Sequence, residues 1–229
     1  MMNDFLETLR ALGGKLVPQF LKRARLRRRE FRDFDSAAYW EQRYHDRGNS
    51  GAGSYGRLAL FKAEVINKFI ADKNIRTVIE FGVGDGNQLK LLNVPQYTGF
   101  DVSETILDKV RETFKDDASK SFLHTRDFKT QTADLAMSLD VIYHLVEDPV
   151  FEKYMTDLFS GARKYVIIYS SNCSKRRCLH VLHREFTNWV SKNRPDWRLI
   201  EKIPNRYPFS EADQANTSFA DFYIFEKVR

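Results

Sequence analysis

The sequence predicts an α/β fold, in which a mostly parallel sheet of seven strands has helices on both faces. Three observations carry this prediction. Short apolar segments alternate with helical patterns from about residue 76 onward, which is typical of parallel strands joined by crossover helices. A glycine-rich turn follows the first of these segments. The chain ends in two strand-like segments separated by a Pro/Asn-rich stretch, which we expect to form an antiparallel hairpin at the sheet edge.

The expected elements follow in the order that such a sheet requires. Residues 36–46 are expected to form a helix with Ser36 as its N-cap, and a loop with four glycines follows over residues 48–56. Further helices are expected over residues 58–72, 87–92, 104–115, 149–160 and 178–192. Strands are expected over residues 76–81, 97–101, 121–124, 133–138, 164–169, 197–203 and 219–227.

Length and charge indicate one domain with a basic extension. The chain has 229 residues, 42% of them hydrophobic, and a net charge of +6. Residues 1–35 carry nine Lys/Arg against five Asp/Glu, so we divide the chain into a basic amphipathic helical arm over 1–35 and a domain over 36–229. No apolar run approaches the roughly 18–20 residues that span a bilayer, and no signal-peptide pattern is present. The expected location is therefore cytoplasmic.

The arm leaves several interpretations open. Residues 15–32 combine apolar positions with a cluster of arginines, a pattern that suits peripheral contact with an anionic membrane or an acidic partner. A solvated helix, or one that packs on the domain, would give the same pattern. An RNA-binding arm is a further alternative.

The segment after the first expected strand carries the strongest chemical signal. Glu80 precedes three alternate glycines, Gly82, Gly84 and Gly86. Glycine permits a tight turn there and lets a ligand approach the backbone. A dinucleotide fingerprint, G-x-G-x-x-G, would need its third glycine at position 87, where the chain has Asn87. This spacing argues against an NAD-dependent oxidoreductase, which stays the rival within the same fold.

The second signal is an acid at the end of the next strand. Asp101 lies 19 residues after Gly82, and a carboxylate at that place can accept hydrogen bonds from both ribose hydroxyls of a nucleoside. Alternatively, Asp101 caps the helix that starts near Ser103. The acid by itself predicts a nucleoside ligand and does not choose between cofactors.

Together these motifs resemble class I S-adenosylmethionine (SAM)-dependent methyltransferases, which have a Rossmann-like fold. The resemblance implies SAM as cofactor, with Glu80 holding its amino end and Asp127 at its adenine amino group. The cofactor contacts it implies are Tyr55, Glu80, Phe81, Gly82, Gly84, Gly86, Gln88, Asp101, Val102, Asp127 and Phe128.

The fourth expected strand leads into Asp140 and His144. Ligands bind at the carboxyl ends of parallel strands, and in the family that the chain resembles this end faces the methyl group. The Asn/Asp-Pro-Pro-aromatic motif of nitrogen-directed members is absent. The segment Leu139–Leu145 resembles that of small-molecule and oxygen-directed members, and the chain is similar to bacterial surface-glycan methyltransferases. This resemblance implies methyl transfer to oxygen of a small-molecule or glycan acceptor. His144 is the candidate base, although it could instead pack on the cofactor or cap the helix. Asp140 could orient His144 or contact SAM. An RNA acceptor is the alternative, and no metal is expected.

Overall fold

The structure is a computed structural model, and it describes residues 34–228, except the side chains of Arg176 and Arg177. Residues from Asp35 onward form a compact unit of their own. The helices expected within the first 33 residues, and the basic stretch 15–32, lie outside the described residues. No helix within the described range is long and apolar enough to cross a membrane.

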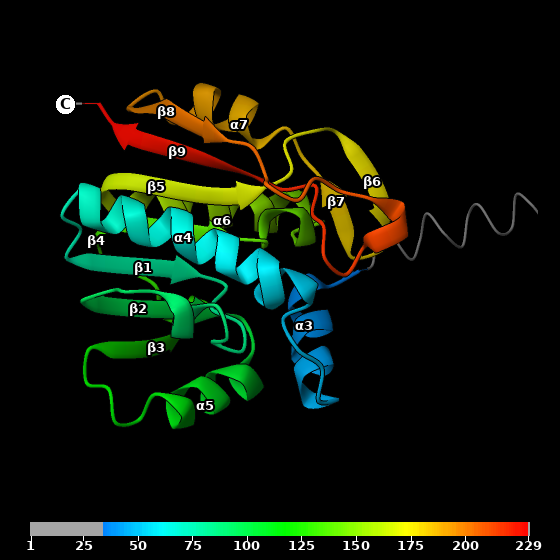
Figure 1. Ribbon diagram of the computed structural model, residues 1–229, viewed down its shortest axis with the longest axis horizontal. Helices are drawn as coiled ribbons and strands as arrows, with labels where there is room; N and C mark the ends of the chain where they lie inside the picture. The colour runs from blue at the N-terminus through cyan, green and yellow to red at the C-terminus, as the bar shows by residue number, and fades with distance from the viewer. Residues whose placement is uncertain (1–33, 229) are drawn as a thin grey trace, which may run out of the picture. The chain divides into compact units, whose positions relative to one another are not determined.

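A seven-stranded sheet forms the centre of this unit (Figure 1). Its first five strands pair in parallel, and β9 runs antiparallel to both of its neighbours. The predicted mostly parallel sheet with a C-terminal antiparallel hairpin is therefore confirmed. In spatial order the strands are β3 (Lys120–His124), β2 (Gln96–Asp101), β1 (Thr77–Phe81), β4 (Ala133–Leu139), β5 (Ala162–Ser170), β9 (Asp221–Lys227) and β8 (Trp197–Ile203).

Helices cover both faces of the sheet. The helices α4 (Gly56–Asp72) and α5 (Glu104–Thr113) pack on one face, and α6 (Asp148–Ser160) and α7 (Phe186–Asn193) pack on the other. The alternation along β4 explains the two cores, because Leu135 and Met137 join the first one and Ala136 joins the second. A central strand that is apolar on both sides is what a sheet between two helical layers requires.

The first described helix, α3 (Ser36–His45), begins as expected but with a different cap. Asp35 is its N-cap, and the carboxylate accepts a hydrogen bond from the Ala38 N–H at 2.9 Å. Ser36 was the expected cap, and that expectation is wrong by one residue. Its backbone N–H instead donates to Glu147 Oε1 at 2.7 Å, which ties the start of the helix to the segment before α6.

Two of the expected helices are wrong. Residues 175–183 form a separate two-stranded antiparallel sheet of β6 (Lys175–Cys178) and β7 (Val181–His183), so α7 covers only the last part of the expected helix 178–192. Val181 and His183 are buried, and Leu182 between them is only partly buried. This alternation is the two-residue period of a strand. The expected helix 87–92 is one 3₁₀ turn, η2 (Leu89–Leu91), and Pro95 soon follows it.

Candidate active site

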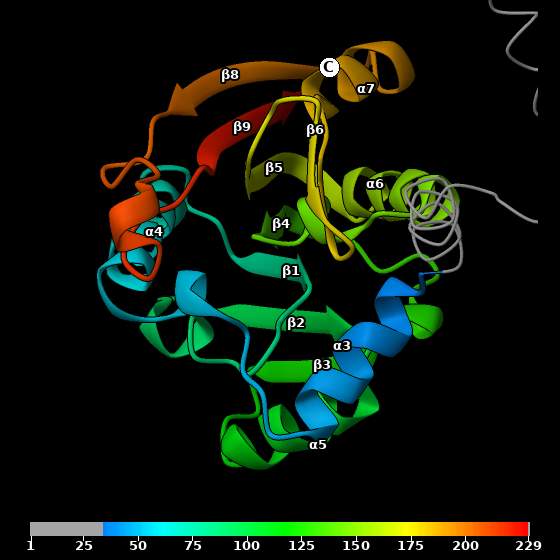
Figure 2. The same ribbon diagram turned by 90° about the vertical axis from the view of Figure 1, so that its right-hand side faces the viewer.

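A cavity of about 450 Å³ lies at the carboxyl ends of β1, β2 and β4. Helix α3 crosses this end of the sheet (Figure 2). This volume lies within the usual range for small-molecule and cofactor sites. Nine of the candidate residues line the cavity, which shows that segments far apart in sequence meet here: Glu80, Phe81, Gly82, Gly84, Gln88, Asp101, Val102, Asp140 and His144.

Four other candidates do not line the cavity: Tyr55, Gly86, Asp127 and Phe128. The Phe128 ring packs in the core against Phe81, with ring centroids 5.1 Å apart. The Tyr55 hydroxyl donates to Asp85 Oδ2 at 2.6 Å. Asp127 is exposed at the end of a 3₁₀ turn whose two other residues do reach the cavity. Cofactor contacts of these four residues stay predictions.

Asp101 is the buried acid at the end of β2. Its Oδ2 accepts the Gly84 N–H at 2.9 Å, and its Oδ1 accepts the Ser103 N–H at 3.1 Å. The residue is 6% exposed, and this burial raises the pKa of its carboxyl to about 6. The helix α5 is capped by the Ser103 side chain, which accepts the Ile106 N–H. Asp101 therefore joins the glycine turn to the start of α5 while still facing the cavity.

The glycine turn is packed against protein as well as open to the cavity. Gly84 has φ +57, and a Cβ there would come within 2.3 Å of Ser50 Oγ. Ser50 and Asp85 exchange two hydrogen bonds, from the Ser50 N–H at 3.0 Å and from the Asp85 N–H at 2.8 Å. The glycine-rich loop before α4 therefore sits directly on the turn. The sequence suggested a ligand as the reason for Gly84, and the structure adds Ser50 as a second reason.

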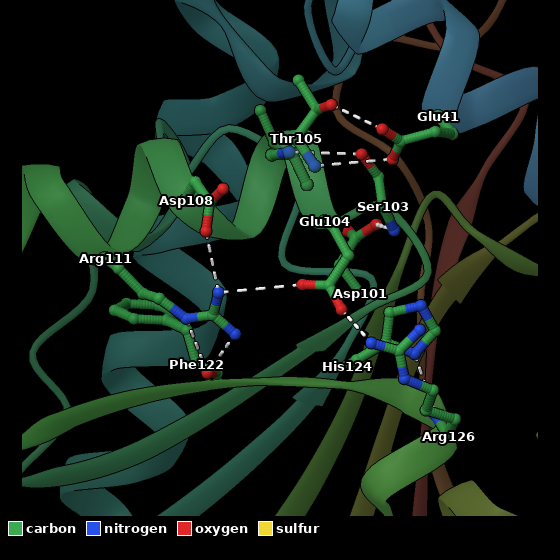
Figure 3. A network of polar contacts seen from close by, with 11 residues as sticks. Glu41, Asp101, Ser103, Glu104, Thr105, Asp108, Arg111, Phe122, His124 and Arg126 are labelled. Atoms are coloured by element: carbon green, nitrogen blue, oxygen red, sulfur yellow. Dashed lines mark hydrogen bonds and ion pairs between the residues drawn. The ribbon is translucent and has the colours of Figure 1, made fainter.

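Helix α3 forms a wall of the cavity, which the sequence did not indicate. Trp40 and Tyr44 line the cavity from this helix. Glu41 fixes the helix to the N-terminus of α5, because its carboxylate accepts from the Thr105 hydroxyl at 2.5 Å and from the Thr105 N–H (Figure 3). Together with the Ser36 bond, this contact holds α3 at its first residue and at its middle. An aromatic-rich helix ahead of the glycine-rich loop was the available signal.

His144 lies in a ring of aromatic side chains at the cavity wall. Its Nδ1 is 2.9 Å from the backbone oxygen of His180, so Nδ1 carries the proton and donates. The Trp40 ring meets the imidazole edge-on at 4.9 Å, and the His180 ring stacks parallel to it at 5.9 Å. Burial lowers the pKa of His144 to about 4. His144 is therefore neutral at physiological pH, with Nε2 as its proton acceptor.

A buried lysine pairs with Asp140. Lys62 of α4 is 1% exposed, and its Nζ is 2.6 Å from Asp140 Oδ2. The Tyr143 hydroxyl donates to the other Asp140 oxygen at 2.8 Å. Asp140 has φ +62, a conformation that costs energy in a residue other than glycine. Sequence reasoning missed Lys62, although it falls on an apolar stripe, four residues after Leu58 and four before Ile66.

Comparison with known proteins agrees with this geometry. Residues 79–158 match a family model described as a methyltransferase domain. No curated protein matches the chain. Among solved structures, magnesium protoporphyrin IX methyltransferase from Synechocystis PCC 6803, with bound SAM, has a TM-score of 0.61 at 14% identity, over 85% of this chain and 98% of that one.

Two further structures have the same fold. The N-methyltransferase NodS from Bradyrhizobium japonicum WM9, with bound S-adenosyl-L-homocysteine, has a TM-score of 0.59 at 15% identity, over 74% of this chain and 85% of that one. The methyltransferase domain of bacterial CtHen1-C has a TM-score of 0.57 at 22% identity, over 73% and 97%.

Residues 79–158 match a methyltransferase domain, and the sheet has the fold of a methyltransferase solved with bound SAM, so SAM is the cofactor with which the cavity is compared. The described residues fit this cofactor. A buried carboxylate, Asp101, faces the cavity at the place expected for ribose hydroxyls. Gln88 also lines the cavity, and its Oε1 is a buried acceptor without a hydrogen-bond partner among the described residues, which suits a ligand that brings donors.

We expect Asp101→Ala to weaken binding of S-adenosyl-L-homocysteine by roughly 1.5–3 kcal/mol, the range for hydrogen bonds to a charged group. Calorimetric titration measures the change, with the exposed Asp108→Ala as control. Because the pKa of Asp101 is raised to about 6, its ionised form is lost as the pH falls below that value. Affinity of the unmodified chain should therefore fall toward about pH 5. An Asp101→Ala variant with unchanged affinity would remove this residue from the site.

Proposed function

We propose that this enzyme methylates an oxygen atom of a small-molecule acceptor, with His144 as the base. The observation that carries the proposal is the environment of His144: a neutral imidazole in the cavity wall, with Nδ1–H donating to the His180 carbonyl. That bond fixes the tautomer and leaves Nε2 to accept a proton. When bound, SAM supplies an electrophilic methyl group on a sulfonium.

A base with a low pKa suits this task. His144 has a pKa lowered to about 4 by burial, so it would remove a proton poorly from an ordinary alcohol. A hydroxyl oxygen that is gaining a methyl group becomes a much stronger acid, and a weak base placed beside it is then sufficient. The protein's other contributions are to position the acceptor and to exclude water.

The walls next to His144 favour an acceptor with an apolar or aromatic body. Trp40 and Tyr44 come from α3, and Leu145, Pro149 and Val150 come from the segment after β4. These apolar walls favour a small molecule with an apolar or aromatic body. A glycan acceptor, and the RNA alternative that rests on residues 15–32, are left to the test.

The test is a set of acceptors incubated with SAM and the full chain, with methylated products identified by mass spectrometry. The set contains phenols and other hydroxyl-bearing aromatic molecules, matched amines, oligosaccharides and short RNAs. The proposal expects methylation of a hydroxyl in the first group. Product only from an amine, an oligosaccharide or an RNA would contradict the proposed acceptor class.

With an acceptor in hand, His144→Gln should lower kcat by about 10²–10⁴-fold, the usual range for losing general base catalysis. Affinity for S-adenosyl-L-homocysteine should stay within about twofold of the unmodified chain, because the proposed role concerns the acceptor proton. His45→Gln, an exposed position at the end of α3, is the matched control. A His144→Gln variant with normal kcat would show that His144 only packs in the wall.

A further inference from the structure

The cavity lining includes a polar side chain, Gln88, that neither the glycine turn nor His144 accounts for. Gln88 is 5% exposed, and its Nε2 donates to the Ala59 carbonyl at 3.1 Å. Its Oε1 is buried and accepts no hydrogen bond among the described residues. Three other atoms share this condition, in Glu147, Ser170 and Trp197, and none of those residues lines the cavity. Because a buried acceptor without a donor is costly, Gln88 Oε1 points to a ligand that donates.

Opposite charges lie at the same cavity. Lys62 and Asp140 both line it, and they pair at 2.6 Å. Asp140 also accepts the Tyr143 hydroxyl, so two side chains, one from α4 and one from the 3₁₀ turn after β4, fix its carboxylate in place. A lysine this deeply buried is rarely kept for stability alone, because desolvation offsets most of the attraction in the pair. The pair gives the cavity one fixed anion and one fixed cation.

Glu80 is the acid that the resemblance assigns to the amino end of SAM. Its surroundings make it a poorer partner for an ammonium group. Its Oε2 accepts the Tyr97 hydroxyl at 2.7 Å. Burial raises the pKa of the Glu80 carboxyl to about 7, so this group is partly protonated at neutral pH. Asp140, in contrast, is held in an ion pair with Lys62 at the cavity.

We propose that Lys62, Gln88 and Asp140 form the seat for the zwitterionic amino-acid end of the cofactor. Gln88 Oε1 and the Asp140 carboxylate accept hydrogen bonds from the ligand ammonium. Lys62 donates to the ligand carboxylate, since it has three N–H donors and one of them serves Asp140. The chemical class recognised is an α-amino acid zwitterion, joined to the nucleoside that Asp101 holds.

The experiment compares two ligands that share the nucleoside and differ at this end. S-adenosyl-L-homocysteine carries the amino-acid group, and 5′-methylthioadenosine lacks it. Calorimetric titration of the full chain gives both affinities for each variant. We expect Gln88→Leu to weaken S-adenosyl-L-homocysteine by about tenfold or more, and to leave 5′-methylthioadenosine within about twofold. Asp140→Asn, which keeps the size and removes the charge, should give the same selective loss.

Asp101→Ala is the control, because it should weaken both ligands alike. Thermal melting of each variant without ligand separates a loss of the seat from a loss of the fold. Equal weakening of both ligands in Gln88→Leu and Asp140→Asn would overturn the proposal, and so would unchanged affinity for S-adenosyl-L-homocysteine in both variants. Because the experiment measures ligand binding, its result does not depend on whether the acceptor proposed above is methylated.

Discussion

Replacing Gly84 by Val should abolish measurable binding of SAM, with a loss of about 100-fold or more. A β-branched residue at φ +57 is strained by roughly 1–3 kcal/mol. Its Cβ would also meet Ser50 Oγ at 2.3 Å, so the loop that closes the turn must move. The Gly84 N–H that donates to Asp101 would then shift as well. A turn displaced in this way loses its contacts with the ligand and with Asp101, which together reach the about 2.8 kcal/mol that a 100-fold change requires.

Gly56→Val is the matched control for this prediction. Gly56 has φ +54, close to that of Gly84, and a Cβ there meets nothing within 4 Å. The two substitutions therefore share the backbone strain and differ in the clash with the closing loop. Calorimetric titration should find near-normal affinity in Gly56→Val and none in Gly84→Val. Equal losses in the two variants would mean that strain alone, and no specific packing at the turn, explains the effect.

Replacing Lys62 by Met should lower the free energy of unfolding by about 3–5 kcal/mol, the range for removing one partner of a buried ion pair. Asp140 would keep a buried charge with only the Tyr143 hydroxyl as partner in the described part of the chain. Chemical denaturation measures the loss. The exposed Lys68→Met, which breaks a pair with Asp72 on the same helix, should leave the free energy of unfolding essentially unchanged.

A double variant checks that the effect belongs to the pair. Lys62→Met combined with Asp140→Leu removes both charges, and it should recover part of the stability lost in Lys62→Met. Additive losses in the double variant would show that the two charges do not act on each other. In that case Lys62 would be a packing residue of α4.

Periodic patterns in the sequence were enough to predict the sheet and most of its helices. Strands such as 133–138 and 164–169 are apolar runs between turn signals, and burial on both faces explains that pattern. The same patterns wrongly predicted a helix from residue 178, because Leu179, Leu182 and Phe186 also fit a helical period. The inward positions of Val181 and His183 in a two-stranded sheet depend on contacts with distant segments, such as the 2.5 Å contact from His183 Nδ1 to Ser171 Oγ.

In the site, too, residues explained by their neighbours in sequence could be predicted, and residues explained by distant partners could not. Glycine spacing and the acid at the end of β2 follow from the local needs of a turn and a strand end, so Gly84 and Asp101 could be found from the sequence. Lys62 looked like one more charged residue of an amphipathic helix, because only its distant partner Asp140 explains its burial. The wall formed by α3 rests on Glu41 and Thr105, whose contact spans 64 positions of the chain.

Calorimetric titration of the purified full chain with SAM measures whether the cavity at the glycine turn binds this cofactor. We expect saturable binding to a single site, competition by S-adenosyl-L-homocysteine, and no binding of NADH. Mass spectrometry under native conditions should find one cofactor per chain. A folded chain that gives no saturable binding with either SAM or S-adenosyl-L-homocysteine up to about 1 mM, equivalent to a binding free energy of about −4 kcal/mol, would contradict the account.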